Sequence, residues 1–572
     1  MVLEFKEYTK KIKRDMILEL DFRVETGEIL TIVNNSSSSL ELLKDSFRQR
    51  TKFKGEILFD GENINNQRLL FAKDFGFYND LSLLKNIKKA LALFNIKILE
   101  EELINDLEFL GLESSKKYKE LREKYPNFIY DSYKIEEDNE NIYITFKFKI
   151  EGLTTFNPSL TIKKKNYIKE PIINNNIVKN LVFNIGLVEL ISYWKSTFSK
   201  NLIIKAGYIN KDQIKWFKKL YYLGLGELRY TNNIEISEDE LMNIKSIGEE
   251  LDIENDLKNI NEAEYTNFII PIGGGKDSNV TLEVLPTDTS KDYCIIINPK
   301  EVTLACAKAA GFENDNIIEI KRTIDPNLID LVKQGYINGH TPFSAMVSFT
   351  TYLLGYLTHR KYICLSNESS ANESNVVGEN INHQYSKSFE YEEDFKYYSS
   401  TYLKIPTFYF SFLRPLNELQ IAKLFAKQKK YHQIFKSCNV GSRKEPWHWC
   451  CSCPKCLFVY IILSPFLYKA DLIDIFKKDL YEDETLLETF KGLTGHSDWK
   501  PFECVGTFEE INFAVSKTIV NLERQELPYL LKYYKENYGL YDLNEDITKR
   551  YNEENNLPKE LDNILKGAIF ND

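Results

Sequence analysis

The chain has 572 residues and a formal net charge of −10, and 43% of its residues are hydrophobic. This length exceeds what one hydrophobic core supports and predicts about three domains, while the apolar content excludes an intrinsically disordered chain. The acidic balance excludes a general electrostatic attraction to nucleic acid, and we expect no nucleic-acid partner.

The composition also predicts a cellular location. Uninterrupted apolar runs of about 18 residues do not occur, so we predict no membrane span. Residues 1–15 lack the apolar centre of a signal peptide, which predicts a cytoplasmic protein. Of nine cysteines, five lie between Cys438 and Cys456. In a reducing compartment, such a cluster predicts a metal site rather than disulfides.

Residues 1–115 predict a first unit. Residues 17–33 alternate like two strands joined at Thr26 and Gly27, residues 54–64 repeat this pattern, and helices are expected from about 82 to 110. This order resembles the start of an ABC-transporter ATPase subunit. In residues 34–41, however, the lysine and glycines of its phosphate loop are missing. The resemblance therefore implies a degenerate, partial ATPase-like unit without ATPase chemistry, whose partner is unknown.

Residues 116–255 predict an α+β region that serves substrate binding or an accessory role. Residues 116–140 are charged and irregular, which predicts a linker, and residues 141–150 alternate as a strand. Helices are expected over 180–198 and 212–233, with a short strand between them at 201–208. In the turn that ends the second helix, Glu227 and Arg229 either face a cleft or form a solvated ion pair, and we favour the ion pair.

Residues 256–470 alternate between short apolar strands and helices. Strands are expected at 268–271, 293–298, 316–320 and 362–367, with helices over 299–312 and 342–360. This alternation predicts an α/β fold with a doubly wound parallel sheet. Ligands bind such sheets beyond the carboxyl ends of the strands, where we place the polar segments 273–278, 338–344 and 366–375. Residues 471–572 are expected to form a helical C-terminal region.

A glycine-rich turn separates the first of these strands from its helix. Gly273, Gly274 and Gly275 precede Lys276, Asp277 and Ser278. Glycines let the backbone approach a ligand, and a helix N-terminus attracts anions. The spacing differs from a Walker A loop, because Ser278 stands two places after the lysine. The segment resembles the SGGxDS loop of the ATP pyrophosphatase (PP-loop) superfamily. This implies phosphate binding by the N–H groups of residues 274–278, contact of Asp277 and Ser278 with pyrophosphate and Mg²⁺, and a charge partner in Lys276.

Residues suited to proton transfer follow the last predicted strand. A helix beginning near Gln384 would place His383, Lys387 and Glu390 near one face. These side chains transfer protons when their pKa values are tuned. Glu368 and Glu373, in the preceding loop, are candidate magnesium ligands or bases.

Two further residues are candidates for substrate binding. His340 lies in the polar segment 338–344, whereas His359 follows an apolar helix and is interpreted as its cap. Arg414 stands in an Arg-Pro turn before a helix with Glu418 in its first turn. A guanidinium there is suited to bidentate binding of an anionic group.

The cysteine cluster predicts a structural zinc site. Cys453 and Cys456 have zinc-knuckle spacing. Cys438, together with either Cys450 or Cys451, would complete four thiolates, and His448 is an alternative ligand. Four protein ligands close a tetrahedral site, so we expect a structural Zn²⁺ rather than a catalytic one.

The order of these motifs resembles the UDP-N-acetylmuramoyl-L-alanyl-L-glutamate epimerase family over residues 125–470. The segments that carry it are 224–233, 271–278, 338–342, 366–373, 382–392, 413–425 and 453–460. The resemblance implies an ATP- and Mg²⁺-dependent isomerase of peptidoglycan precursor synthesis that inverts the terminal L-Glu of UDP-MurNAc-L-Ala-L-Glu after adenylation of its carboxylate.

On this resemblance, the candidate residues take roles. The loop 273–278 activates the carboxylate. His383 and Lys387 are the candidate base and acid, and Glu368 and Glu390 are further catalytic candidates. Arg414 and His340 hold the substrate.

A second hypothesis is another PP-loop enzyme, either tRNA-thiolating or deazaguanine nitrile-forming; the latter type also has a C-terminal zinc cluster. A third is a non-catalytic binding or regulatory protein built on the first unit.

Overall fold

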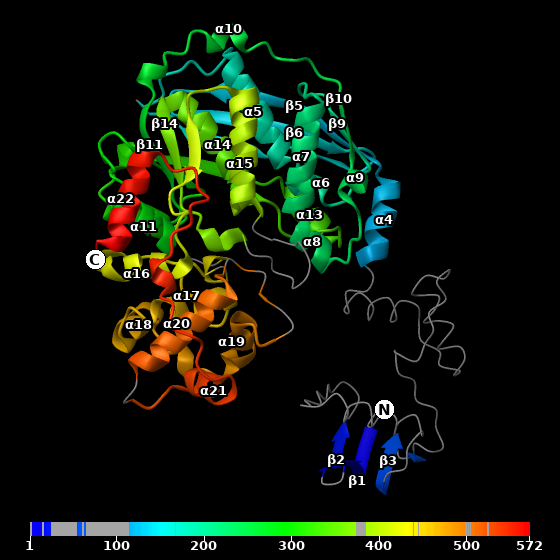
Figure 1. The fold of residues 1–572 in the computed structure, drawn as a ribbon. Coiled ribbons are helices and arrows are strands. Elements are labelled where there is room, and N and C mark those ends of the chain that lie inside the picture. The colour runs from blue at the N-terminus through cyan, green and yellow to red at the C-terminus, as the bar shows by residue number, and fades with distance from the viewer. Residues whose placement is uncertain are drawn as a thin grey trace. The chain divides into compact units, whose positions relative to one another are not determined.

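The computed structural model describes residues 3–13, 16–24, 54–59, 62–63 and 114–572, apart from 166, 373–384, 439, 444–445, 498–499, 502, 504, 523–524 and 572. The chain divides into two compact units, Met1–Phe109 and Leu110–Asp572. Figure 1 shows both units and labels many of their elements.

The described part of the first unit is a four-stranded antiparallel sheet in the order β2-β1-β3-β4. Its strands are β1 Leu3–Lys13, β2 Met16–Val24, β3 Lys54–Phe59 and β4 Glu62–Asn63. β2 confirms the first strand expected within 17–33, and β3 confirms the strand expected within 54–64. β1 was missed because lysines and glutamates interrupt its apolar alternation. The second strand expected within 17–33, residues 34–41 and the helices expected over 82–110 lie outside the described residues.

A mixed sheet of 11 strands is the centre of the second unit (Figure 1). Ten strands follow the order β10-β9-β5-β6-β8-β13-β12-β11-β14-β15, and β7 pairs with β6. The strands are β5 Asn127–Glu137, β6 Asn141–Ile150, β7 Thr154–Phe156, β8 Ser159–Lys163, β9 Asn201–Ile204, β10 Asn243–Ser246, β11 Thr266–Pro271, β12 Tyr293–Ile297, β13 Ile317–Thr323, β14 Arg360–Leu365 and β15 Phe408–Ser411. The sheet is continuous across residue 255, because β8 pairs antiparallel with β13.

The last five strands form the parallel half of this sheet. All pairs in the order β13-β12-β11-β14-β15 are parallel. The four strands expected between residues 268 and 367 are confirmed as β11 to β14, whereas β15 was not predicted. The chain builds outward from β11 first in one direction and then, from β14, in the other. In open α/β sheets, the ligand crevice lies at this reversal, outside the carboxyl ends of the strands.

Helices cover both faces of the parallel half. Because successive strand residues point to opposite faces, neighbours enter different cores. Ile269, Ile295 and Ile363 belong to the core that contains residues of α5 (Asn176–Glu189) and α14 (Phe343–Thr358), whereas Ile270, Ile296 and Cys364 belong to the core that contains residues of α11 (Lys276–Val284), α16 (Glu418–Lys427) and α17 (Pro454–Leu463). Strands buried on both faces explain why the sequence shows nearly continuous apolar runs here.

Residues 116–140 are not a linker, as the sequence predicted. They form α4 (Ser114–Lys124) and β5, which lies inside the sheet between β9 and β6. The prediction was wrong because the buried run 128–130 is only three residues long and charged residues surround it. The other expected elements of this region are confirmed as β6, α5 with α6 (Ile191–Trp194), β9, and α7 (Lys211–Gly224) with α8 (Gly226–Thr231).

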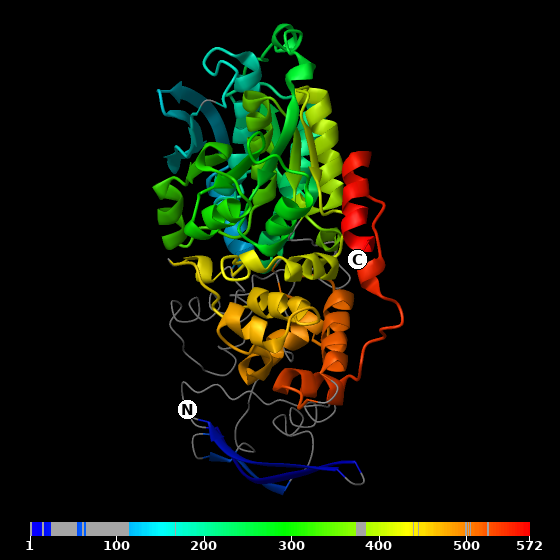
Figure 2. The same cartoon turned by 90° about the vertical axis from the view of Figure 1, so that its left-hand side faces the viewer.

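The remaining helices surround the sheet or form the C-terminal region. They are α9 Glu238–Leu241, α10 Glu254–Leu257, α12 Glu301–Ala309, α13 Pro326–Lys333, α15 Phe389–Tyr398, α18 Lys469–Phe476, α19 Leu487–Thr494, α20 Phe508–Asn521, α21 Tyr529–Asn537 and α22 Lys559–Phe570. Figure 2 shows α22, in red, beside the α/β part of the chain, and it contacts α11 and α16.

One described helical segment is long and apolar enough to cross a membrane. It is Asn176–Trp194, and 83% of its most apolar window is buried inside the fold. Core helices of this kind satisfy the same criteria of length and composition.

A buried ion pair fixes α5 against the parallel half. Arg322 of β13 donates from Nε and Nη2 to the two carboxylate oxygens of Glu189 at 2.9 and 2.8 Å, and Glu189 is 2% exposed. Removing one partner of such a pair leaves a buried charge without compensation. The exposed pair Lys134–Glu136 on β5 provides a control.

We therefore expect Glu189→Gln to lower the free energy of unfolding by about 3 kcal/mol. The matched change Glu136→Gln should alter it by less than about 0.5 kcal/mol. Urea unfolding followed by circular dichroism measures both. Equal unfolding midpoints for the two variants would contradict this role of the Arg322–Glu189 pair.

Candidate active site

The glycine-rich turn joins β11 to α11, as the sequence predicted. Gly274 has φ +81°, a conformation that favours glycine, and a Cβ there would lie 3.2 Å from the side chains of Val302 and Thr303. Gly273 has open space around its Cβ position. Gly275 is the N-cap of α11 and makes no side-chain cap, so no cap side chain covers the first N–H groups of the helix. This arrangement is suited to binding an anion.

A cavity of about 390 Å³ adjoins this turn. It lies at the carboxyl ends of β11, β12 and β14, where the strand order reverses. Its lining comprises turn residues Gly273, Gly275, Asp277 and Ser278, strand-end residues that include Ile297 and Leu365, and charged residues Glu368, Lys387, Glu418, Lys436 and Lys455. Volumes of about 300–1,000 Å³ with a few convergent polar groups are typical of small-molecule sites.

Lys276 is buried beneath the turn rather than solvated. Its side chain is 1% exposed, and Nζ is hydrogen-bonded to the carboxylates of Asp277 and Glu418. Burial alone would lower the pKa of Lys276, but the carboxylates of Asp277, Glu418 and Glu368 together raise it above its ordinary value. Lys276 is therefore a permanent cation that joins the turn to α16.

Three carboxylates face the cavity: Asp277, Glu368 and Glu418. Burial raises the pKa of Glu418 above its ordinary value, and Asp277 and Glu368 add to this effect, whereas the charges of Lys276 and Lys455 oppose it. For Asp277, burial is outweighed by Lys276 and Lys455, which hold its pKa below the usual value. Carboxylate oxygens are the donors that Mg²⁺ prefers.

Sequence reasoning missed the contribution of Glu418. Its only signal was an acidic residue in the first turn of the helix after Arg414. The backbone N–H of Glu418 also donates to buried Glu510 at 2.8 Å, which accepts from Ser370 Oγ as well. Glu510 lies on α20, so the C-terminal region helps to position this wall of the cavity.

Lysines Lys387, Lys436 and Lys455 also line the cavity, opposite in charge to the carboxylates. Lys387 was predicted as a site residue. Lys436 and Lys455 were not, because both lie in the cysteine-rich segment, which the sequence suggested only as a metal site. Cations beside a helix N-terminus increase the attraction of the cavity for phosphate groups.

Arg414 is fully buried, and protein groups surround its guanidinium. Nη1 donates to the carbonyl of Glu368 and Nη2 to the carbonyl of Lys387, each at 2.7 Å. Nε and Nη2 also contact Glu392 Oε2 at 3.3 and 3.2 Å. The sequence predicted that Arg414 binds substrate. The structure places it where it positions two cavity residues through their backbone, which favours a supporting role.

The sequence predicted a helix from about Gln384 that would carry His383, Lys387 and Glu390 on one face, and this helix start is wrong. α15 begins at Phe389, because Ser388 caps it through the N–H of Tyr391, and Lys387 precedes the helix in a 3₁₀ turn. Glu390 is exposed and pairs with Lys219 at 2.7 Å, and it is not among the residues that line the cavity. His383 and Glu373 lie outside the described residues.

His340 lies just before α14, whose first residues Phe343 and Ser344 line the cavity. Its Nδ1 is 3.9 Å from Glu227 Oε2, and Arg229 stacks on the Tyr222 ring with its guanidinium carbon 3.7 Å from the ring centre. His359, interpreted as a helix cap, is the C-cap of α14.

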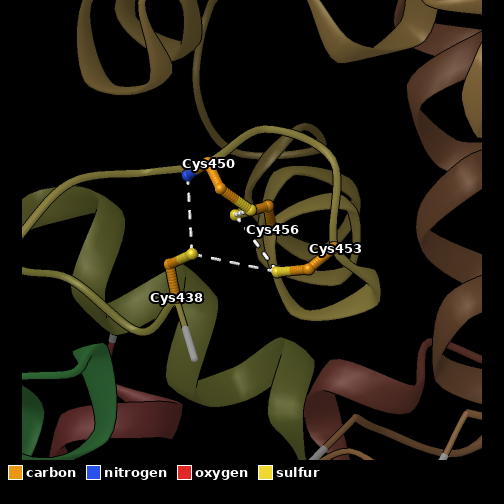
Figure 3. Close-up of side chains that lie close together, drawn as sticks. All are labelled: Cys438, Cys450, Cys453 and Cys456. Carbon is orange, nitrogen blue, oxygen red and sulfur yellow. Dashed lines mark hydrogen bonds between the residues drawn. The ribbon is translucent and has the colours of Figure 1, made fainter. Parts of the chain in front are cut away.

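Four cysteine sulfurs lie close together (Figure 3). The sulfurs of Cys438, Cys450, Cys453 and Cys456 are all within 4.8 Å of one another. The separations are 3.9 Å for Cys438–Cys453, 3.8 Å for Cys450–Cys456 and 3.5 Å for Cys453–Cys456. A tetrahedron with Zn–S bonds of about 2.3 Å has edges of roughly 3.8 Å. The N–H of Gly441 donates to Cys438 Sγ at 3.0 Å.

The geometry also decides between the candidate ligands. Cys451 Sγ points to the carbonyl of Phe476 at 3.2 Å, and His448 is exposed with Nδ1 3.1 Å from the carbonyl of Pro446. Of the two alternatives that the sequence left open, Cys450 rather than Cys451 therefore completes the group of four. Cys453 is the N-cap of α17, which carries Lys455 into the cavity.

Comparisons with known proteins place the chain in a family. Residues 119–412 match the MurL N-terminal domain and residues 434–545 match the MurL C-terminal domain. The similar proteins include three named UDP-N-acetyl-alpha-D-muramoyl-L-alanyl-L-glutamate epimerase. No solved structure matches the chain.

The relative from Xanthomonas oryzae pv. oryzae (strain MAFF 311018) is 32% identical over 362 residues, which cover 62% of this chain and 77% of the relative. The relatives from Micromonospora sp. (strain ATCC 39149 / NRRL 15099 / SCC 1413) and Salinispora tropica (strain ATCC BAA-916 / DSM 44818 / JCM 13857 / NBRC 105044 / CNB-440) are 33% and 32% identical. Each covers 57% of this chain, and this chain covers 72% and 70% of them. Because the match to the MurL N-terminal domain alone covers more than half of this chain, the chain belongs to the MurL family.

Proposed function

We propose that this protein inverts the terminal L-Glu of UDP-MurNAc-L-Ala-L-Glu to D-Glu, the activity named for its three relatives. The structural observation that supports it is the cavity at the sheet reversal, which combines an anion-binding turn with both cations and carboxylates. The family match favours this function over tRNA thiolation, deazaguanine nitrile synthesis or a purely regulatory role. An ATP-dependent step on a nucleotide-linked precursor fits the cytoplasmic location that the sequence predicts.

The chemistry needs activation of the substrate. The α-proton beside a carboxylate is hard to remove, because the product would be a dianion. ATP would supply an adenylyl group, with release of pyrophosphate, and so convert this carboxylate into a mixed anhydride whose α-proton is more acidic. Hydrolysis of the anhydride after inversion would release AMP and restore the carboxylate. In this proposal the N–H groups of residues 274–278 hold the phosphates as in a PP-loop enzyme, and Lys387, Lys436 and Lys455 offset their charge.

Asp277 and Glu368 are the residues we assign to Mg²⁺, because both line the cavity with carboxylate oxygens. Lys276 holds Asp277 against α16 and keeps it ionised, since it lowers the pKa of Asp277. Arg414 positions the backbone at Glu368 and Lys387. Preorganised groups of this kind spare the reaction the cost of arranging charges during the chemical step.

We also propose a structural Zn²⁺ held by Cys438, Cys450, Cys453 and Cys456. A four-thiolate site has no open position, so the metal would stabilise the fold and take no part in proton transfer. It would hold the start of α17, and with it Lys455, against the segment that begins with Ser437.

The full-length protein with ATP, Mg²⁺ and UDP-MurNAc-L-Ala-L-Glu should release pyrophosphate and yield D-Glu. Chiral chromatography of the glutamate after acid hydrolysis, together with a pyrophosphate assay, measures both outcomes. Inversion should stop when ATP is omitted or EDTA is added. Pyrophosphate release without inversion would instead support a different adenylating enzyme, and the absence of both would refute the proposal.

Asp277→Asn should slow pyrophosphate release by about 10²-fold or more, because it removes a carboxylate from the phosphate and Mg²⁺ site. Asp288→Asn is the matched control. Asp288 follows α11 and pairs with Lys291 in solvent, so the Asp288→Asn variant should release pyrophosphate at the wild-type rate. A Mg²⁺ titration of pyrophosphate release compares the variants. If both behave like the wild type, Asp277 has no role in this step.

Purified protein should contain about one Zn²⁺ per chain by mass spectrometry of the metal content. Cys450→Ser should lower this content and the melting temperature, because one thiolate of the set is lost. Cys451→Ser changes the neighbouring thiol, which points away from the set, and should keep the metal. Equal zinc content in the two variants would disprove the assignment of Cys450.

A further inference from the structure

Two segments that lie far apart in sequence are packed closely beside the cavity. A Cβ on Gly224 would lie 2.6 Å from Pro342, and a Cβ on Gly339 would lie 2.9 Å from Leu228. Only glycine permits such approaches without displacement of the neighbour. The Nζ of Lys195 also donates to the carbonyl of Gly339 at 2.7 Å. The backbone of residues 339–342 is therefore held firmly against residues 224–228.

This packing brings His340 and Glu227 together. His340 Nδ1 lies 3.9 Å from Glu227 Oε2, and the two side chains are 35% and 21% exposed. Both side chains are therefore partly buried. Hydrogen bonds of catalytic groups are often long without substrate and shorten when it binds.

The pair lies near the acid candidate of the cavity. Lys387 lines the cavity, and its charge acts on His340. Phe343 and Ser344, three and four residues after His340, also line the cavity. A glutamyl group activated at the turn 273–278 would share this cavity with Lys387 and with the start of α14, which follows His340.

The surroundings favour a neutral imidazole backed by a titrating carboxyl. Burial, Lys387 and Lys195 lower the pKa of His340 to about 4, so the ring is neutral at pH 7. Burial and Glu503 raise the pKa of Glu227 to about 7. A neutral imidazole can accept a proton, and a carboxylate behind it stabilises the imidazolium that forms.

We propose that His340 is the general base of the epimerase and that Glu227 is its positioning residue. The proposal rests on the proposed function and replaces the substrate-binding role predicted for His340. The α-proton passes to Nε2 of His340, and the electrons of the C–H bond move toward the activated carbonyl. The Nδ1–H then donates to the Glu227 carboxylate. The Lys387 ammonium gives a proton to the opposite face of Cα, and exchange with water resets both groups.

His340→Gln and His496→Gln are a matched pair for the test, because His496 is an exposed histidine that does not line the cavity. His340→Gln should keep pyrophosphate release within about 3-fold of the wild type and lose inversion by about 10²- to 10⁴-fold. α-Deuterium incorporation in deuterium oxide should fall in parallel. His496→Gln should keep inversion. Melting temperatures establish that each variant is folded. If His340→Gln does not fold, His340→Asn takes its place.

Glu227→Gln and Glu227→Asp test the positioning role. In the wild type the inversion rate should rise with pH around 7, as Glu227 becomes a carboxylate that can stabilise the imidazolium. Glu227→Gln should lower the rate by at least about 10-fold and remove this rise, and Glu227→Asp should restore part of both. The charged groups that act on the pair, Lys387, Lys195 and Glu503, are unchanged in these variants.

Three results would overturn the inference. They are inversion by His340→Gln at the wild-type rate, an equal loss of inversion in His496→Gln, and loss of pyrophosphate release together with inversion in His340→Gln. The last would place His340 in substrate binding or adenylation. If the wild-type protein itself releases no pyrophosphate and inverts no glutamate, the proposed function fails instead.

Discussion

The ion pair between buried Lys276 and Glu418 is the contact on which the candidate site depends. It joins residues 142 positions apart in sequence and fixes the turn after β11 to the first turn of α16. A buried ammonium is tolerated only when carboxylates compensate for its lost hydration. The carboxylates of Asp277 and Glu418 supply this compensation, and their contact with Lys276 fixes the positions of both side chains. The cavity walls are thus held by charge rather than by apolar packing alone.

The same principle recurs around Arg414. Its guanidinium is fully buried and binds the carbonyls of Glu368 and Lys387, and the carboxylate of Glu392 balances its charge. Glu510 extends the network from α20 to α16. Candidate catalytic groups of opposite sign are therefore held in fixed places, and each depends on a second layer of buried polar contacts. Sites of this kind lose activity when the supporting layer is changed, even if every group that touches substrate remains.

Local features of the sequence predicted much of this arrangement. The strands β11 to β14, the glycine-rich turn and the cysteine set depend on residues close in sequence, so pattern and spacing were sufficient. Features that depend on distant residues were missed. Glu418 meets Lys276 only through the fold, and Arg414 resembles an exposed anion-binding residue until its interior position is known. β5 was missed because its neighbours in the sheet, rather than its own charged sequence, make it a strand.

The last residues of the chain return to α16 in the structure. Asn417 Nδ2 donates to the carbonyl of Ile547, Gln420 Nε2 donates to that of Arg550, and α22 contacts both α11 and α16. Domains generally fold from their N-terminus as synthesis proceeds. Here α16, which carries Glu418, reaches these contacts only after residues 547–570 have been made. A polypeptide that ends before residue 547 would therefore lack this support for α16, even with every residue of the cavity present.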